Sequence, residues 1–400
     1  MTAGFDVDRV RSLFPALGEG TAFFDGPGGS QVPRQVAHAI AATLAAGLSN
    51  RGRLTSTERR ADETVRDARS AVADLVGGRP EGIVFGRSMT QLTFDLARSL
   101  ARRWGPGDEV VVTRLDHDAN IRPWALAAEA VGAAVRWVDL DPDSAELVLG
   151  PELLGERTRL VAVTGASNLL GTRPDVAGIA RAAHAVGALV FVDGVHLTPH
   201  APVDVSAVGA DFYACSPYKF FGPHLGALVA DPSLLETVHP DKLLPATDTV
   251  PERFELGTLP YELLAGVTAA VDVIADLAPG PGTTRRERIL ASMAAVEEHE
   301  DRLLACLMAG LDDLPDVTMY GAPARRTPTV LFSVAGHAGP EVHEHLGGLG
   351  VNAPAGSFYA LEASRRIGLG DTGAVRAGLA PYSCEQDVDR LLSGLASIGV

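Results

Sequence analysis

Lysine is nearly absent from this chain. The sequence has 34 basic residues, of which only Lys219 and Lys242 are lysines, so the other 34 − 2 = 32 are arginines. An arginine guanidinium stays protonated and cannot serve as an amine. Any chemistry that needs a Schiff base must therefore use one of these two lysines.

Cysteine and long apolar runs are also scarce. The three cysteines, Cys215, Cys306 and Cys384, form no CxxC pair, which argues against a disulfide framework or structural zinc and favours a cytoplasmic location. The most hydrophobic long stretch, 261–279, contains three acidic residues and predicts no membrane span. The first residues are charged and lack the apolar core of a signal peptide.

Positive charge is in deficit as well. The formal net charge is 34 − 50 = −16, and the sequence pI is about 5.1. No basic footprint offsets this balance, so nucleic acid and anionic membrane are excluded as main partners. Apolar residues make up 46% of the chain, which is enough for buried cores. The length of 400 residues favours two domains.

What is present is an alternation of helical and strand-like patterns between about residues 60 and 250. Short apolar runs joined by helices predict an α/β fold with a mostly parallel sheet covered on both faces. Ligands in such sheets bind beyond the carboxyl ends of the strands, and Asp193 directly follows one run. We predict helices at 58–76 and 176–186 and strands at 109–113, 159–164 and 188–192.

The pattern changes near residue 280. Thr284 and Glu287 have the spacing of a capping box, which predicts the start of a long amphipathic helix. Short strand-like pieces and a final helix at 385–398 follow. We therefore predict three parts: an N-terminal segment, 1–30, at the edge of the active site, a large domain, 31–279, and a smaller α+β domain, 280–400.

Lys219 is the candidate reactive amine. It lies between aromatic residues and a Gly-Pro turn, where a solvated loop lysine is an equally good interpretation, but Asp193 precedes it by 26 positions at a strand end. Pyridoxal 5'-phosphate needs a lysine imine, a carboxylate facing its pyridine nitrogen, and a phosphate cradle. Lys219 and Asp193 supply the first two, and Ser216 supplies a nearby hydroxyl.

The chain resembles the class V aminotransferase family, which includes the cysteine desulfurases, over nearly its whole length. This resemblance implies the aspartate-aminotransferase-like fold, with a seven-stranded sheet in the large domain and pyridoxal 5'-phosphate as cofactor. The segments that carry it are GRSMTQ (86–91), LDHDANIRPW (115–124), GASNLLGT (165–172), VDGVH (192–196), DFYACSPYKFFGPHLG (211–226), FELGTLP (254–260) and VRAGLAPYS (375–383).

The resemblance also implies roles for individual residues. Lys219 carries the cofactor as a Schiff base, Asp193 faces the pyridine nitrogen and His117 stacks on the ring. The threonine of the 254–260 motif reaches the phosphate of a neighbouring subunit, which implies a homodimer with shared active sites. The positions implied to bind the cofactor are Met89, Thr90, His117, Asn168, Asp193, His196, Ser216, Tyr218, Lys219 and Thr258.

On the substrate side, Arg376 is implied to grip the substrate carboxylate. Arg51, in a segment similar to the family's H-R-G loop, is expected at the substrate entrance, and Gly28 is expected to leave room for a larger amino acid. The family's nucleophilic cysteine is missing, and Tyr359 stands about where it would be. His196 and Tyr218 replace the family's glutamine and histidine.

These features predict an enzyme that acts on an amino acid. The favoured reaction is β-eliminating C–S cleavage of a cysteine-derived or S-conjugated substrate without an enzyme persulfide. Transamination, epimerisation and decarboxylation use the same residues and stay open, whereas true cysteine desulfuration is disfavoured by the missing cysteine. A non-catalytic scaffold is disfavoured by the intact lysine, aspartate and arginine. No metal site is expected, because Pro199 interrupts the helix that a His196–His200 pair needs.

Overall fold

The computed structural model describes residues 5–150, 152–280 and 282–398. Its large sheet has the strand order β2-β9-β8-β7-β6-β3-β4-β5. Strand β9 is antiparallel to β2 and β8, β5 is antiparallel to β4, and the other neighbouring pairs are parallel. The strands are β2 Ile83–Gly86, β3 Glu109–Thr113, β4 Ala134–Leu140, β5 Leu147–Val148, β6 Thr158–Thr164, β7 Leu189–Asp193, β8 Phe212–Cys215 and β9 Gly226–Ala230. The prediction of a mostly parallel, seven-stranded sheet is confirmed, with β5 as an additional two-residue edge strand.

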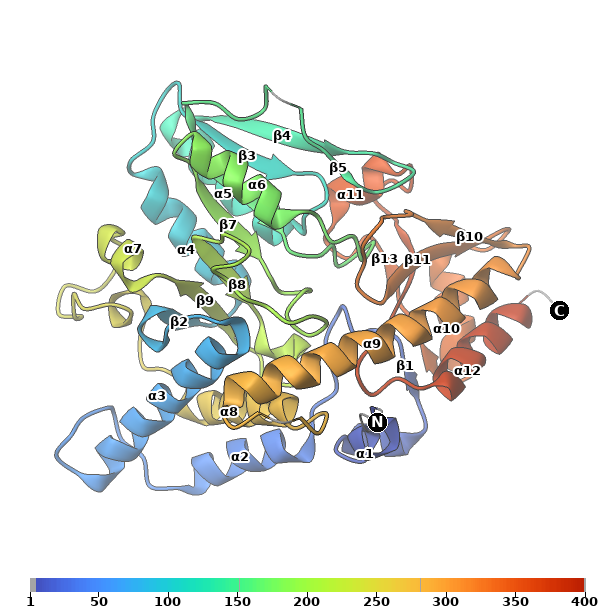
Figure 1. Cartoon of the computed structure of the whole chain (residues 1–400), viewed down its shortest axis with the longest axis horizontal. Helices are drawn as coiled ribbons and strands as arrows, with labels where there is room; N and C mark the ends of the chain where they lie inside the picture. Colours follow the sequence, from blue (N-terminus) through green and yellow to red (C-terminus); the bar gives the residue numbers. More distant parts are fainter. Residues whose placement is uncertain (1–4, 151, 281, 399–400) are drawn as a thin grey trace.

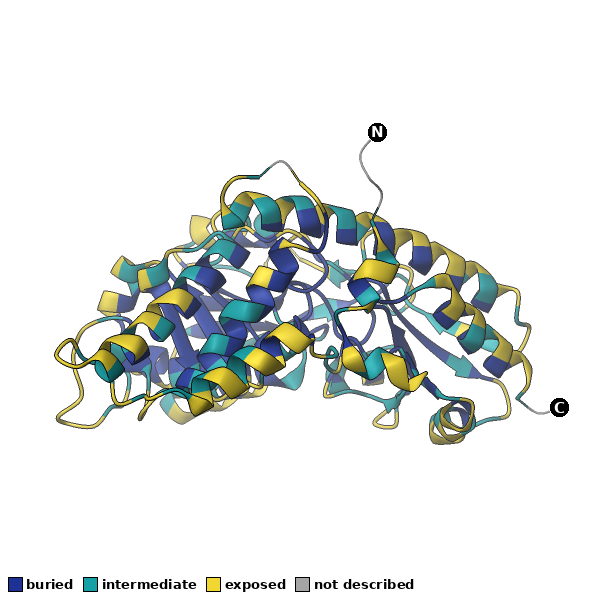
Figure 2. Ribbon diagram, turned by 90° about the horizontal axis from the view of Figure 1, so that it is seen from below, coloured by how far each residue is buried: buried dark blue, intermediate teal, exposed yellow. Residues whose placement is uncertain are grey.

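Both faces of this sheet are buried because the side chains of its central strands alternate between two cores. Val110 and Val112 pack with Trp124 in one core, whereas Val111 packs with Val65 in the other. Helices α4 (Met89–Ala101) and α5 (Arg122–Val131) contribute to the first core. Helices α3 (Ser56–Val76), α6 (Val176–Ala185) and α8 (Tyr261–Ala275) contribute to the second. Figure 2 shows this layering as buried strands between helices with exposed outer faces.

The second sheet is small and antiparallel, with the order β10-β11-β14-β13. Helix α9 (Arg285–Asp312) extends from α8 to β10 and links the two sheets (Figure 1). The predicted capping box of Thr284 and Glu287 begins this helix. The other elements are β10 Val317–Tyr320, β11 Thr329–Val334, β13 Ala355–Gly356, β14 Ala374–Gly378, α10 Gly339–Gly348, α11 Leu361–Arg366 and α12 Glu385–Ala396. The domain boundary at 279–280 stays a prediction.

The N-terminal segment pairs with the C-terminal part of the chain, in a two-stranded sheet separate from the other two. After α1 (Val7–Arg11), strand β1 (Ala22–Phe23) pairs in parallel with β12 (Val351–Asn352), and Asp25 forms a bridge to Gly378. The chain then turns toward the large sheet, where α2 (Arg34–Ala45) packs on α8. This path carries residues 25–30 between the two sheets.

Two further observations complete the architecture. Helix α7 (Pro232–Thr237) follows β9 at the edge of the large sheet (Figure 1). Within the described ranges, none of the helices has the length and apolar character that crossing a bilayer requires.

Candidate active site

A pocket of about 480 Å³ lies at the carboxyl ends of the central strands, where an open α/β sheet binds its ligands. Nine of the ten positions predicted to bind the cofactor line this pocket, and Thr258 does not. The lining residues are Ser88, Met89, Thr90, His117, Ala119, Thr164, Ala166, Asn168, Asp193, Val195, His196, Ser216, Tyr218 and Lys219.

Lys219 ends a short 3₁₀ turn, Pro217–Lys219, that follows β8. Its side chain is buried, and its Nζ donates a hydrogen bond to the carbonyl oxygen of Pro27. Burial, with a smaller contribution from the charge of Arg376, lowers the pKa of Lys219 to about 8. A larger fraction of this lysine is therefore a free amine near neutral pH than of an exposed lysine. Lys242, in contrast, does not line the pocket and pairs with Asp248 at 3.1 Å.

Asp193 is the last residue of β7, and its Oδ1 accepts a hydrogen bond from the Val195 amide at 2.9 Å. Burial raises the pKa of Asp193 to about 6, although the positive charge of Lys219 opposes this rise. The carboxylate is therefore ionised near neutral pH, and a protonated pyridine nitrogen would stabilise that charge.

A second buried carboxyl, close enough to Asp193 to feel its charge, was not predicted. Asp116 is fully buried and accepts hydrogen bonds from the Thr113 hydroxyl and from Asn120 Nδ2, the latter at 2.7 Å. Burial raises the pKa of Asp116 to about 8, so this carboxyl is mainly neutral at pH 7. The only sequence signal was its place just after a buried apolar strand and just before His117.

His117 is held as a neutral ring. Its Nδ1 accepts a hydrogen bond from the Ala119 amide at 3.0 Å, and burial lowers its pKa to about 4. The positive charges of Lys219 and Arg376 repel a protonated imidazole and lower the pKa of His117 further. The imidazole stacks on the ring of Tyr359, with 5.4 Å between centroids and 29° between planes. A neutral ring at the pocket wall suits stacking on a planar cofactor.

The N-terminus of α4 forms one end of the pocket. Ser88 caps the helix by accepting a hydrogen bond from the Gln91 amide, which leaves the first amides, at Met89 and Thr90, without a helical partner. Gly226 allows this close approach, because a Cβ there would lie 2.4 Å from the Met89 nitrogen. Unpaired amides at a helix start favour a phosphate, and the Thr90 and Ser216 side chains lie along the same pocket.

Two buried polar atoms on the pocket wall await a partner. Asn168 Oδ1 and His196 Nδ1 have no hydrogen bond among the described residues. The rest of each side chain is anchored: Asn168 Nδ2 donates to the Phe358 carbonyl at 3.0 Å, and His196 Nε2 contacts the Thr327 and Thr329 hydroxyls at 2.9 and 3.1 Å. Buried polar atoms are normally paired, so a polar ligand fits here. With the lysine, the carboxylate and the helix N-terminus, this donor set fits pyridoxal 5'-phosphate.

The substrate side differs from the prediction in one important respect. Arg376, on β14, is buried and does not line the pocket. Its Nη2 donates to Asp25 Oδ1 at 2.6 Å, and its Nη1 donates to the Asn168 carbonyl at 3.0 Å. Asp25 was not predicted as a site residue. Gly28 lies in the same turn as Asp25, because the Gly28 amide donates to the Asp25 carbonyl at 2.9 Å.

Tyr359 lies on the outer rim of the site with 75% of its surface exposed. Its backbone has a φ of +60°, and its carbonyl accepts a hydrogen bond from the Asp118 amide at 2.7 Å. The loop that contains Tyr359 is thus tied down over His117. The resemblance implies a mobile nucleophile at about this position, whereas here a backbone hydrogen bond holds the loop.

None of the three cysteines, all of which the structure describes, lines the pocket. Cys215 is buried in β8, and burial raises its pKa to about 12, so it stays a thiol. Cys306 is exposed on α9, and Cys384 precedes α12 with its Sγ 3.4 Å from Asp387.

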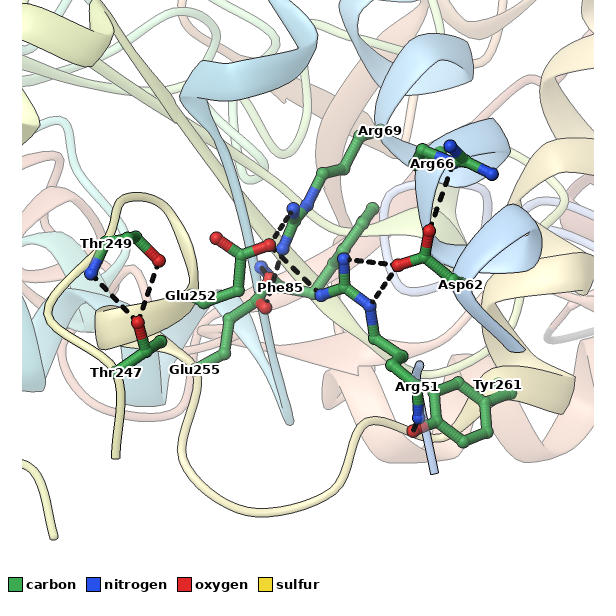
Figure 3. Close-up of polar contacts among 10 residues, drawn as sticks. All are labelled: Arg51, Asp62, Arg66, Arg69, Phe85, Thr247, Thr249, Glu252, Glu255 and Tyr261. Atoms are coloured by element: carbon green, nitrogen blue, oxygen red, sulfur yellow. Dashed lines mark hydrogen bonds and ion pairs between the residues drawn. The ribbon is translucent and has the colours of Figure 1, made fainter. Parts of the chain in front are cut away.

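Arg51 and Thr258 do not reach the pocket within one chain. The Arg51 guanidinium pairs with Asp62 at 2.9 Å and with Glu252 at 3.0 Å, and Glu252 also pairs with Arg69 at 2.7 Å (Figure 3). Thr258 is exposed. The charge of Arg51 is thus neutralised by this network within one chain. The expectation that Arg51 faces the substrate entrance stays a prediction.

The fold and the pocket define a class of protein: a pyridoxal-phosphate enzyme of the aspartate-aminotransferase-like fold. The family model for class V aminotransferases matches residues 22–391. The chain belongs to the class V aminotransferase family, whose members use pyridoxal 5'-phosphate to act on amino acids.

Particular relatives span the whole chain. It is 37% identical over 401 residues to an uncharacterized protein of Mycobacterium tuberculosis, covering 99% of this chain and all of that one. It is 33% identical over 423 residues to a cysteine desulfurase of Dickeya dadantii, covering 98% and 97%. The crystal structure of the cysteine desulfurase CsdA from Escherichia coli superposes with a TM-score of 0.86 at 27% identity, covering 98% of each chain.

Proposed function

We propose that this protein is a C–S lyase that removes a thiol from the β-carbon of a cysteine-derived or S-conjugated amino acid. The reaction converts the substrate and water into pyruvate, ammonium and a free thiol. The observation that carries the proposal is a complete lysine–aspartate pocket whose lining contains none of the chain's three cysteines.

Each side chain has a task in this reaction. Bound pyridoxal 5'-phosphate supplies an electron sink for the pair left on the substrate's α-carbon. Lys219 Nζ, with a pKa lowered to about 8, takes the α-proton as a general base. Asp193 would hold a negative charge toward the pyridine nitrogen of the bound cofactor, and neutral His117 would cover its ring. Arg376 orients the substrate carboxylate.

The missing nucleophile supports the lyase over the desulfurase. A desulfurase needs an enzyme cysteine within reach of the substrate sulfur, to accept it as a persulfide. Here the loop at 352–362 contains Phe358 and Tyr359 and no cysteine, and it is tied to Asn168 and Asp118. The thiol therefore leaves as such, without transfer of sulfur to the protein.

The test is a product analysis with S-methyl-L-cysteine. Equal amounts of pyruvate and methanethiol support the lyase. A keto acid that keeps its S-methyl side chain supports transamination, a racemised substrate supports epimerisation, and loss of CO₂ supports decarboxylation; any of these three would overturn the proposal.

We also propose that the enzyme is a cytoplasmic homodimer in which Thr258 serves the partner's phosphate site. Support comes from the large apolar side chains that one chain leaves exposed near this segment, among them Leu244 at 96% and Leu256 at 54%, since such surface favours an interface. Sedimentation equilibrium gives the mass in solution. In a dimer, mixing Thr258→Ala with Lys219→Ala chains would restore one site with both residues intact.

A further inference from the structure

The positive charge of Arg376 is already neutralised inside the chain. Asp25 Oδ1 lies 2.6 Å from Arg376 Nη2, and the Asn168 carbonyl takes Nη1 at 3.0 Å. The ring of Phe358 covers one face of the guanidinium, with 3.7 Å between its centroid and Arg376 Cζ. Of the donors on Arg376, Nε has no hydrogen-bond partner among the described residues.

The turn that carries Asp25 is built to present this carboxylate to Arg376. Asp25 bridges to Gly378, two residues beyond Arg376 on β14. The side chain then folds back over the turn, so that a Cβ at Gly28 would lie 2.4 Å from Asp25 Oδ2. A glycine is therefore needed at position 28 for this pairing, which gives Gly28 a reason other than room for a larger substrate.

The two partners differ in their access to water. The Arg376 side chain is 2% exposed, whereas the Asp25 side chain is 35% exposed. Arg376 is thus fixed, and Asp25 can turn toward solvent. A carboxylate that binds Arg376 must either displace Asp25 or accept its repulsion, and both cost free energy.

We propose that Asp25 is a specificity-determining residue that competes with the substrate's α-carboxylate for Arg376. This inference rests on the assignment, under the proposed function, of Arg376 to the substrate carboxylate. Beyond that assignment, binding of the carboxylate requires the Asp25–Arg376 pair to open.

The same turn also holds the reactive lysine. The carbonyl of Pro27, between Asp25 and Gly28, accepts the hydrogen bond from Lys219 Nζ. An amine that carries an α-carboxylate displaces Asp25 and loosens this turn. An amine without a carboxylate leaves the turn in place, so its binding does not incur this free-energy cost.

The test compares L-alanine with ethylamine, which is the same amine without the carboxylate. Both are titrated against the holoenzyme, and the cofactor's absorption reports binding. In Asp25→Asn, the amide oxygen can still accept from Arg376, but the competing charge is gone. We expect the apparent Kd for L-alanine to fall about tenfold and that for ethylamine to change less than about twofold.

Asp118→Asn is the matched control. Asp118 lies beside the loop at 352–362, and its carboxylate pairs with Arg122 rather than Arg376. It should alter neither Kd. An unchanged or higher Kd for L-alanine in Asp25→Asn, or an equal change in Kd for both amines, would overturn the proposal. If Asp25→Asn unfolds, as thermal melting would show, Asp25→Ser is titrated instead and must give the same order.

Failure of the competition and failure of the proposed function are separable. L-Alanine has no leaving group, so the titration does not depend on C–S cleavage. Arg376→Gln tests the shared assumption: it must weaken L-alanine and leave ethylamine unchanged. If Arg376→Gln has no such effect, the carboxylate assignment itself is wrong.

Discussion

The two ends of the active site are built in different ways. The cofactor end comes from strand ends and a helix start of one sheet, and its residues lie within 131 positions of one another, from Ser88 to Lys219. The substrate end is assembled by Asp25, Phe358 and Arg376, which are brought together across 351 positions. At the first end the lysine, the aspartate and the helix start lie in one pocket, whereas at the second Arg376 is already paired with Asp25. We therefore propose that the cofactor end carries the reaction chemistry and that the substrate end sets the specificity.

The largest expected effect is at the cofactor end. Lys219→Ala removes the only amine in the pocket, so turnover should fall by about a thousandfold or more, and the cofactor should be lost on gel filtration. Activity and cofactor absorption check this, with Lys242→Ala as a control that keeps both. Cofactor retention by Lys219→Ala but not by Lys242→Ala would reverse the assignment.

The next effect separates the two buried carboxyls. Asp193→Asn removes a charge beside the pyridine nitrogen and should lower kcat by about 100- to 1000-fold. Asp116→Asn replaces a group that is already mainly neutral and should change kcat only a few-fold. Steady-state kinetics with S-methyl-L-cysteine measure both. Equal losses in the two variants would mean that Asp116 also carries charge.

A third comparison asks what Arg51 does within one chain. Arg69 and Glu255 are paired at 2.7 Å with side chains only 7% and 4% exposed, so Arg69→Gln should cost about 3 kcal/mol of unfolding free energy. The Arg51 pairs are more exposed, and Arg51→Gln should cost about 1 kcal/mol or less. Denaturant unfolding tests this. If Arg51→Gln leaves stability intact but raises KM, Arg51 faces substrate as the resemblance implies.

The smallest expected effect is on pH dependence. The pKa of Asp116 is about 8 in the folded chain and about 3.9 when unfolded. The folded state therefore binds the extra proton between these values, and wild-type stability falls as pH rises through this window. Asp116→Asn lacks this loss, so its stability relative to wild type should rise between pH 5 and 7, by about 1 kcal/mol or more. Melting curves at the two pH values show it; a constant difference would contradict the buried, neutral carboxyl.

The cofactor end could be predicted because its residues follow from local patterns. Asp193 ends one buried strand and Lys219 follows the next, and parallel strands bring such ends to one edge of the sheet. The capping box at Thr284 and the strand at 109–113 were likewise readable from local spacing. Asp116 was missed because the sequence does not show which of the two carboxyls that flank His117, Asp116 or Asp118, will be desolvated.

The substrate end could not be predicted in the same way. The Asp25–Arg376 pair depends on the pairing of β1 with β12 and on the bridge from Asp25 to Gly378, which no local pattern reveals. Arg51 resembled a substrate-site residue, but its partner Glu252 is 201 positions away, and only the fold brings that charge to it. Long-range ion pairs decide which charges remain free for a ligand.

The central claim is C–S cleavage without an enzyme cysteine, and the chain's three cysteines make a direct test practical. A cysteine-free chain, with Cys215→Ala, Cys306→Ser and Cys384→Ser, is assayed for pyruvate and thiol from S-methyl-L-cysteine, alongside wild type and with the fold checked by melting. The account predicts turnover within a few-fold of wild type and no sulfur adduct on wild-type cysteines after incubation with L-cysteine. Loss of turnover in a folded, cofactor-loaded cysteine-free chain, with a persulfide on one wild-type cysteine, would contradict it.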